Sequence, residues 1–228
     1  MKHLAAVVAF GALTISVLAQ ADIEPARFQG GAIPTVPVLM TAGADVIVSA
    51  AVSDAGRVTA VDVLRTTPGF TDAVVQAVQT WRFTPALDSD RKPMNTRVLV
   101  EAVARPPSLT TPTIGTPPKD VAAPDPRVPY PAQAPTPLYP VNARTEGTVV
   151  VEARVDASGH VVAVTAVRSS PPFDTPALDA AQSWTFRPAQ GPGAPASTYA
   201  YMIFVFRQPI VGPTAPSGAP PTSTPRTP

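Results

Sequence analysis

Apolar and polar residues alternate in the second half of the chain in a pattern that predicts a β-hairpin. Every second position from 149 to 155 is apolar: Val149, Val151, Ala153 and Val155. This period of two is typical of a half-buried strand. The sequence Asp156-Ala157-Ser158-Gly159 follows, and we expect a turn because Asp accepts backbone hydrogen bonds and Gly tolerates positive φ. The apolar run 161–167 then predicts the returning strand.

A helix and a third strand are predicted after the hairpin. Three apolar residues have the spacing i, i+4 and i+7 of one helical face: Ala177, Ala181 and Trp184. We expect Thr175 to cap this helix and Pro176 to occupy its first turn. Pro188 prevents further helix, and the apolar run 199–206 predicts a last strand. The predicted order is therefore strand, strand, helix, strand.

The same pattern occurs earlier in the chain. A Trp-x-Phe-x-Pro motif is present twice, 103 positions apart, and the same offset relates two turn glycines, so we assign structural roles to Gly56, Trp81, Phe83, Pro85, Gly159, Trp184, Phe186 and Pro188. Without a gap, about 20 of about 70 aligned positions are identical, which predicts a tandem duplication. The same offset of 103 positions aligns residues 96–103 with the predicted last strand at 199–206. A module of about 70 residues is near the lower size limit for a stable core, so each module needs its Trp and Phe in the core.

Proline content predicts the boundaries of the modules. The chain has 31 prolines, and ten of them lie between 106 and 136. Such a segment favours extended conformations and builds no packed core. We therefore expect modules at 34–104 and 137–207, a disordered linker at 105–136 that lets each module fold alone, and a disordered Pro/Thr/Ser tail at 208–228.

Short motifs in the second module support a family resemblance. They are Pro137-x-Tyr139-Pro140, Ala143-Arg144, Gly147-x-Val149-x-Val151, Asp156-x-x-Gly159-x-Val161, Arg168-Ser169-Ser170 and Trp184-x-Phe186-x-Pro188. Their order and spacing resemble the C-terminal domain of the TonB energy-transducer family. The likeness over 34–104 is weaker, because Val36 stands at the place of Tyr139 and Ala44 at that of Gly147.

The resemblance implies a fold, a compartment and a partner. The implied class is α+β, with each module a three-stranded antiparallel sheet and one helix (ββαβ). It also implies a periplasmic location and binding of outer-membrane transporters, or other envelope proteins, by strand addition. Self-association through sheet edges is a second expected contact.

The last strand is the first candidate for the binding surface. It is apolar on both faces, with Tyr201, Ile203 and Val205 on one of them. As the last element it is a candidate sheet edge, which can accept an added strand. The alternative is an ordinary core strand, and Tyr139 and Pro140 are then the better binding candidates.

The first residues predict export. Lys2 and His3 precede an apolar run at 4–18 that ends in Ala19-Gln20-Ala21, the small-x-small pattern of signal-peptidase sites. The run is shorter than the roughly 17–20 residues of a membrane span. We expect a cleaved signal peptide at 1–21 and a periplasmic protein. The alternative is a retained inner-membrane anchor, as in an energy transducer.

Charge and residue inventory exclude several functions. The formal charge of +1 falls to 0 without Lys2, so no electrostatic footprint for nucleic acid is present. The absence of cysteine excludes disulfides and thiolate metal sites. The polar residues weighed for catalysis fit turns and helix starts better: Asp156, His160, Ser169, Ser170, Asp174 and Asp179.

The sequence therefore predicts a non-enzymatic envelope protein that recognises other proteins, with no cofactor, metal or small-molecule substrate. Three alternatives stay open. They are an anchored energy transducer, a structural module that binds peptidoglycan or itself, and, with least support, a hydrolase.

Overall fold

The computed structural model describes residues 23–37, 40, 43–104, 125–190 and 197–208. The predicted signal peptide at 1–21 lies outside the described residues, as do 105–124 of the predicted linker and 209–228 of the predicted tail.

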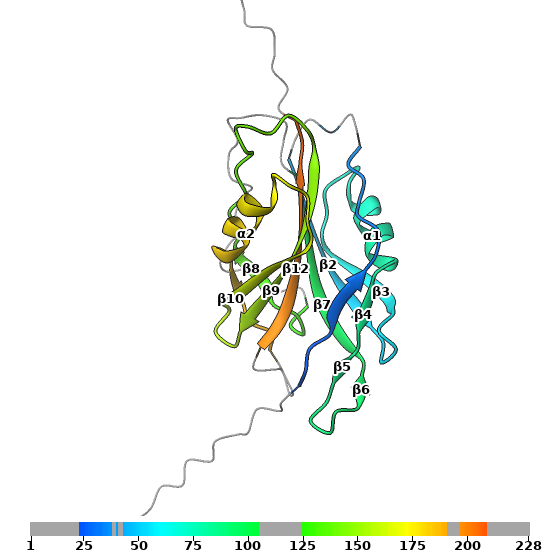
Figure 1. Cartoon of the computed structure of the whole chain (residues 1–228). Helices are drawn as coiled ribbons and strands as arrows, with labels where there is room; N and C mark the ends of the chain where they lie inside the picture. The colour runs from blue at the N-terminus through cyan, green and yellow to red at the C-terminus, as the bar shows by residue number, and fades with distance from the viewer. Residues whose placement is uncertain (1–22, 38–39, 41–42, 105–124, 191–196, 209–228) are drawn as a thin grey trace, which may run out of the picture.

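A six-stranded sheet forms the centre of the molecule (Figure 1). Its strands, in spatial order, are β10 (Val161–Arg168), β9 (Gly147–Asp156), β12 (Ser197–Phe206), β7 (Thr96–Ala104), β2 (Ala44–Val52) and β3 (Val58–Arg65). The helices are α1 (Thr71–Gln79) and α2 (Asp174–Gln182). The fold is thus mixed α and β with a majority of strands, which agrees with the predicted α+β class.

The two halves of the chain meet where β7 and β12 pair. These strands are parallel, with Leu99 opposite Ala200 and Ala104 opposite Val205, whereas the other neighbours in the sheet are antiparallel. The expectation of two separate three-stranded sheets is therefore wrong. Pairing removes the apolar side chains of both strands from water on both faces of the sheet. It also gives hydrogen-bond partners to the backbone groups along one edge of each strand, and both effects explain why the strands associate.

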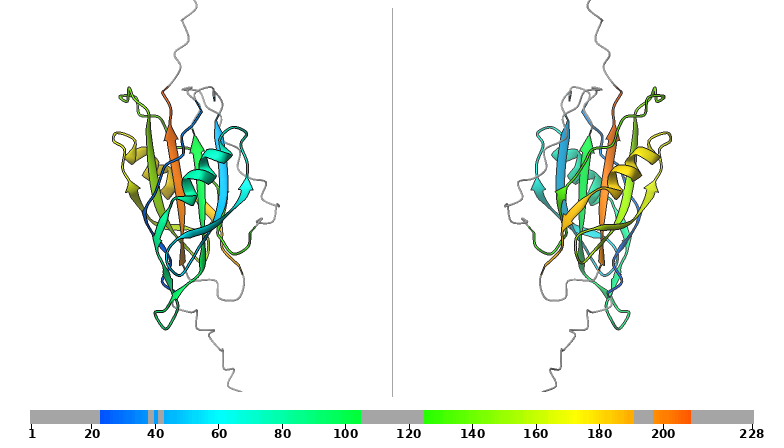
Figure 2. Two further views of the ribbon diagram at one scale, coloured as in Figure 1. Left: turned by 90° about the vertical axis from the view of Figure 1, so that its right-hand side faces the viewer. Right: turned by 90° about the vertical axis from the view of Figure 1, so that its left-hand side faces the viewer.

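The helices cover opposite faces of this sheet. In Figure 2, α1 lies in front of the strands in one view and α2 in the other. Each helix packs on the outer hairpin of its own half, α1 on β2 and β3, and α2 on β9 and β10. Because a strand alternates its side chains between faces, each half also presents a second face to the other half.

Both hydrophobic cores include residues from both halves. The core under α1 includes Tyr201 and Ile203 of β12, and the core under α2 includes Ile47 of β2 and Leu99 of β7. The expectation that a tether separates two independently folding modules is wrong for this structure. Apolar residues on both faces of β7 and β12 leave neither half able to cover its own sheet.

Short strands connect each half to its lead-in segment, which is the stretch of chain before the first long strand of that half. β1 (Arg27–Gly30) pairs with β4 (Arg82–Thr84), and β8 (Tyr130–Gln133) pairs with β11 (Thr185–Arg187). A hairpin of β5 (Ala86–Leu87) and β6 (Pro93–Met94) occurs in the first half. The predicted linker boundary at 136 is wrong, because β8 belongs to the folded structure.

The Trp and Phe side chains of both Trp-x-Phe-x-Pro motifs lie in the cores, as expected. The indole N–H of Trp81 donates to the Ala32 carbonyl at 2.8 Å, and that of Trp184 donates to the Pro135 carbonyl at 2.9 Å. Both tryptophans are buried, with exposed fractions of 0% and 1%. A buried indole needs such an acceptor, so each motif also fixes the lead-in segment of its half.

The turn glycines pack against the same motifs. Gly159 has φ +88°, and a Cβ there would come within 1.9 Å of the Phe186 carbonyl oxygen. Gly56, with φ +72°, has the same relation to Phe83. The carbonyl of each glycine accepts a hydrogen bond from the amide of the corresponding Phe at 2.8 Å. This contact explains why a turn glycine and a distant Phe recur together.

Two details differ from the sequence analysis. Ala50 pairs with Val98 while Ala153 pairs with Ala200, so the offset between the halves falls from 103 to 102 in the last strand. A gapless alignment would exchange the two faces of that strand. Thr175 lies inside α2 and makes no capping bond.

Candidate functional site

The strand predicted to be an edge is in the interior of the sheet. β12 pairs along its length with β9 and along most of it with β7. Tyr201 and Ile203 are fully buried and Val205 is 8% exposed. The prediction that these three residues border an open edge is therefore wrong, because the equivalent strand of the other half occupies that place.

Tyr201 connects the two halves through its hydroxyl. The amide of Phe28 donates to this oxygen at 3.0 Å, and the Glu152 carboxylate lies 3.0 Å away. Burial and then the negative charge of Glu152 raise the pKa of Tyr201, which keeps it neutral. Arg27 pairs with Glu152 at 2.7 Å, and this contact raises the pKa of Arg27. The cluster fastens β1 onto the second half.

Tyr139 and Pro140 do not form an exposed surface either. The Tyr139 ring packs 5.7 Å from Phe173, and its hydroxyl donates to the Thr145 carbonyl at 2.7 Å. Tyr139 is buried and Pro140 is half-buried. Their neighbours Leu138 and Val141 are exposed hydrophobic residues, at 78% and 103%.

The open edges of the sheet are β3 and β10. In the described structure β3 pairs within the sheet only with β2, and β10 only with β9. β3 carries Asp62, whose carboxylate lies 2.6 Å from Arg97. β10 has no charged side chain between Val161 and Val167, and Val162 is 46% exposed. The two edges thus differ in charge.

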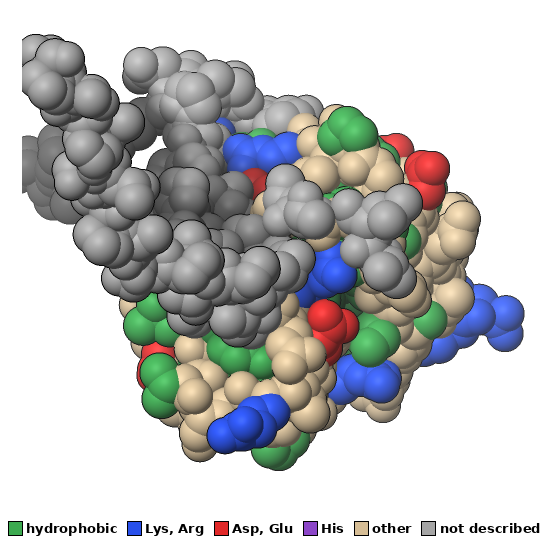
Figure 3. Space-filling view, turned by 90° about the horizontal axis from the view of Figure 1, so that it is seen from above, with side chains coloured by type: hydrophobic (Ala, Val, Ile, Leu, Met, Phe, Trp, Pro, Cys, Tyr) green, Lys and Arg blue, Asp and Glu red, His purple; other side chains and the backbone are tan. Residues whose placement is uncertain are grey.

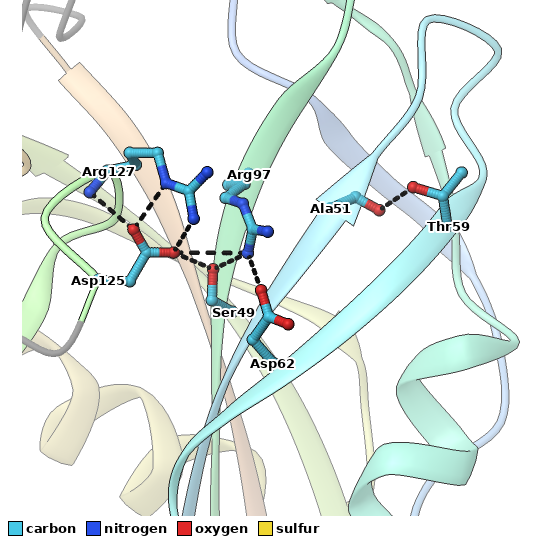
Figure 4. Close-up of polar contacts among 7 residues, drawn as sticks. All are labelled: Ser49, Ala51, Thr59, Asp62, Arg97, Asp125 and Arg127. Carbon is cyan, nitrogen blue, oxygen red and sulfur yellow. Dashed lines mark hydrogen bonds and ion pairs between the residues drawn. The ribbon is translucent and has the colours of Figure 1, made fainter.

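A polar network lies beside the amino-terminal end of β7 (Figure 4). Arg127 donates to both oxygens of Asp125, at 2.8 and 3.2 Å, and Ser49 donates to Oδ2 at 2.9 Å. Arg97 lies 3.4 Å from the same oxygen. Burial alone would raise the pKa of Asp125, but the bonds from Arg127 and Ser49 hold it below its usual range. The sequence gives no signal for this network, because the proline content around Asp125 predicts a linker there.

A second buried group lies on the face of β2 and β7 that α2 covers. Glu101 is 1% exposed, and Asp45 forms an ion pair with Arg65. Burial, followed by the charge of Asp45, raises the pKa of Glu101 well above its usual value. One oxygen of each carboxyl, Oδ1 of Asp45 and Oε2 of Glu101, is buried without a partner among the described residues.

A cavity of about 670 Å³ opens between the amino-terminal ends of β7 and β12. Both strands contribute to its wall, together with the segment before β1 and the loop around Arg127. The lining includes Met94, Thr96, Arg97, Val98, Arg127, Thr198 and Tyr199. Its size is typical of ligand sites. No local pattern in the sequence predicts this cavity, because its walls come from several segments that are far apart in the chain.

The described residues contain no group of His and acidic side chains that could hold a metal. His160 is exposed in its turn, where its amide donates to Asp156 at 2.9 Å and its Nδ1 lies 2.9 Å from Ser158 Oγ. Within the described part, no helix has the length and apolar character to cross a membrane. Figure 3 shows basic and acidic side chains as separate spots on one end of the molecule, consistent with the near-neutral charge.

The fold and its surfaces define a small α+β protein whose sheet has open outer edges. The model of one family, Gram-negative bacterial TonB protein C-terminal, matches residues 34–102 and 126–207. The chain belongs to this family, which indicates an envelope-related domain. The second match includes β8, in agreement with the corrected boundary. No curated protein matches the chain.

Proposed function

We propose that this protein is a periplasmic, non-enzymatic binding protein built from two tandem TonB C-terminal modules (ββαβ) that are fused through their last strands. It recognises an extended segment of an outer-membrane transporter or another envelope protein by strand addition at β10. The observation that carries this proposal is the open edge of β10, which has no charged side chain between Val161 and Val167.

An edge strand offers a row of unpaired amides and carbonyls to an incoming strand. β7 and β12 pair with each other from Leu99 and Ala200 onward, so β3 and β10 are the outermost strands of the sheet in the described structure and are open along their length. Charged side chains on an edge oppose strand addition. β3 has Asp62 at its centre, whereas the equivalent position of β10 is Thr165, and this difference favours β10.

The two halves provide a matched test. Ala163 of β10 and Ala60 of β3 occupy equivalent positions, and both are exposed. Binding is measured to a labelled peptide from the periplasmic-facing segment of an outer-membrane transporter of the same cell. We expect Ala163→Lys to weaken binding at least ten-fold and Ala60→Lys to leave it unchanged. Hydrogen exchange should slow at 161–167; equal affinities for both variants, or slowing only elsewhere, would contradict the proposal.

Two further functions are distinguishable. An energy transducer would keep residues 4–18 as an inner-membrane anchor, whereas a periplasmic protein would have a mature amino terminus at Asp22. Amino-terminal sequencing of the fractionated protein separates these cases. A structural module would bind peptidoglycan or itself, and sedimentation with and without peptidoglycan tests that role independently of any transporter peptide.

A further inference from the structure

The two central strands separate at their amino-terminal ends. β7 begins at Thr96 and β12 at Ser197, but their pairing starts only at Leu99 and Ala200. Figure 1 shows the lower ends of β7 and β12 diverging, in contrast to their close upper parts. Three residues of each strand therefore precede the contact.

Each of these three-residue segments is paired on one side only. Thr96 and Val98 lie opposite β2, and 197–199 lie opposite β9. Their other edges face each other across the cavity, with no described strand between them. The inward backbone donors and acceptors of both segments are thus available to an extended chain placed in the gap.

The walls of the cavity combine apolar surface with positive charge. Val98, Met94 and Tyr199 provide apolar contacts. Two arginines, Arg97 and Arg127, line the cavity, and no Asp or Glu does. Arg97 is occupied by Asp62 and Asp125.

Arg127 has a donor to spare. It uses Nε and Nη2 on Asp125, and its Nη1 has no described partner. Its side chain is 63% exposed. A guanidinium that is held in place on one side and free on the other is suited to bind a second carboxylate.

We propose that this cleft binds a short extended peptide segment that carries a carboxylate. The peptide backbone pairs with the free edges of 96–98 and 197–199, its apolar side chains contact Val98 and Tyr199, and its carboxylate binds Arg127. The carboxylate belongs to an acidic side chain or to a chain terminus. This site is separate from the β10 edge and does not depend on the function proposed above.

The test uses three five-residue peptides of alternating threonine and valine. One is capped and ends in aspartate, one is capped and ends in asparagine, and one is uncapped at a carboxyl-terminal valine. We expect the full chain to bind the aspartate peptide at least ten-fold more tightly than the asparagine peptide. Comparison with the third peptide shows which source of the carboxylate is preferred.

Substitutions locate the site. Arg127→Gln should remove the preference for the acidic peptide, Arg127→Lys should keep part of it, and Arg144→Gln, an exposed arginine in a distant loop, should have no effect. Ala163→Lys should also leave this binding unchanged, which separates the cleft from the β10 edge. Retention of the preference by folded Arg127→Gln would overturn the proposal.

A measurement on the unmodified protein covers the case in which Arg127→Gln does not fold. With the aspartate peptide, hydrogen exchange should slow at 96–98 and 197–199. Slowing only at 161–167 would place the peptide on β10 and overturn the proposal. Binding of N-acetylaspartate as tightly as the peptide would also overturn it, because the site would then be one for small carboxylates.

Discussion

At the scale of single residues, the sheet buries a carboxyl group, that of Glu101. Glu101 stands among apolar residues in β7, and sequence analysis gave it no role. It lies on the face of the first half that the second half covers, beside Asp45 of β2 and Arg65 of β3. Alternation identifies two faces of a strand, but it does not say that both will be covered. Buried acids on the second face were therefore unpredictable.

Glu101 predicts a pH dependence of stability. Its pKa is raised from 4.5 in the folded protein, so the folded state holds this proton more tightly than the unfolded chain. The contribution of Glu101 to the free energy of unfolding is complete below the pKa of this group in the unfolded chain. It is lost as the pH rises through the pKa of the group in the folded protein. Glu101→Gln should therefore flatten the decline of the urea midpoint above about pH 4.5. Asp45 and Arg65, which face this group, are unchanged in the comparison, and an unaltered slope would contradict the assignment.

The turn glycines predict a backbone effect. Gly159→Ala places a Cβ at φ +88° against the Phe186 carbonyl, and Gly56→Ala does the same at Phe83. Each substitution should lower the free energy of unfolding by about 1–3 kcal/mol or more, measured by denaturant unfolding. Gly30→Ala is the control, because nothing lies within 4 Å of its Cβ, and it should stay within about 0.5 kcal/mol. Equal effects at Gly30 and Gly159 would show that the close approach is not responsible.

At the level of elements, local patterns located helices and strands but not all of their neighbours. Periodicity and turn residues placed strands near β9 and β10 and a helix near α2, because these signals are local. The place of β12 as the last strand of its module predicts an edge position. Its apolar residues on both faces also fit an interior strand, and only the partner strand β7 decides between the two.

A proline in β12 distinguishes an interior strand from an edge. Ile203→Pro removes a donor in a strand that is paired on both sides, so we expect the protein not to fold. Ile203→Val should fold and cost about 0.5–1.5 kcal/mol. Far- and near-ultraviolet circular dichroism measure both results. A folded Ile203→Pro protein with native near-ultraviolet signal would contradict the interior position.

At the scale of the whole molecule, the joining of the halves was outside the reach of sequence analysis. Parallel pairing of β7 and β12 connects segments about 100 residues apart, and no local pattern specifies such a contact. The proline-rich segment suggested separation, because composition describes the properties of a connection and not the distance between the parts that it connects. The cleft between these strands has the same long-range origin.

The shared cores predict that the two halves unfold together. Trp81 lies 6.0 Å from Tyr201 of the second half, and Trp184 packs 5.7 Å from Phe204 on β12, the strand that pairs with β7. Trp81→Ala and Trp184→Ala should each cost about 3–5 kcal/mol and move one cooperative transition, followed in parallel by calorimetry and by circular dichroism. Leu138→Ala, at a residue 78% exposed, is the control and should change stability by less than about 0.5 kcal/mol. Two separate transitions, each sensitive to only one tryptophan, would show that the halves fold independently and that the β7–β12 contact does not bind them into one unit.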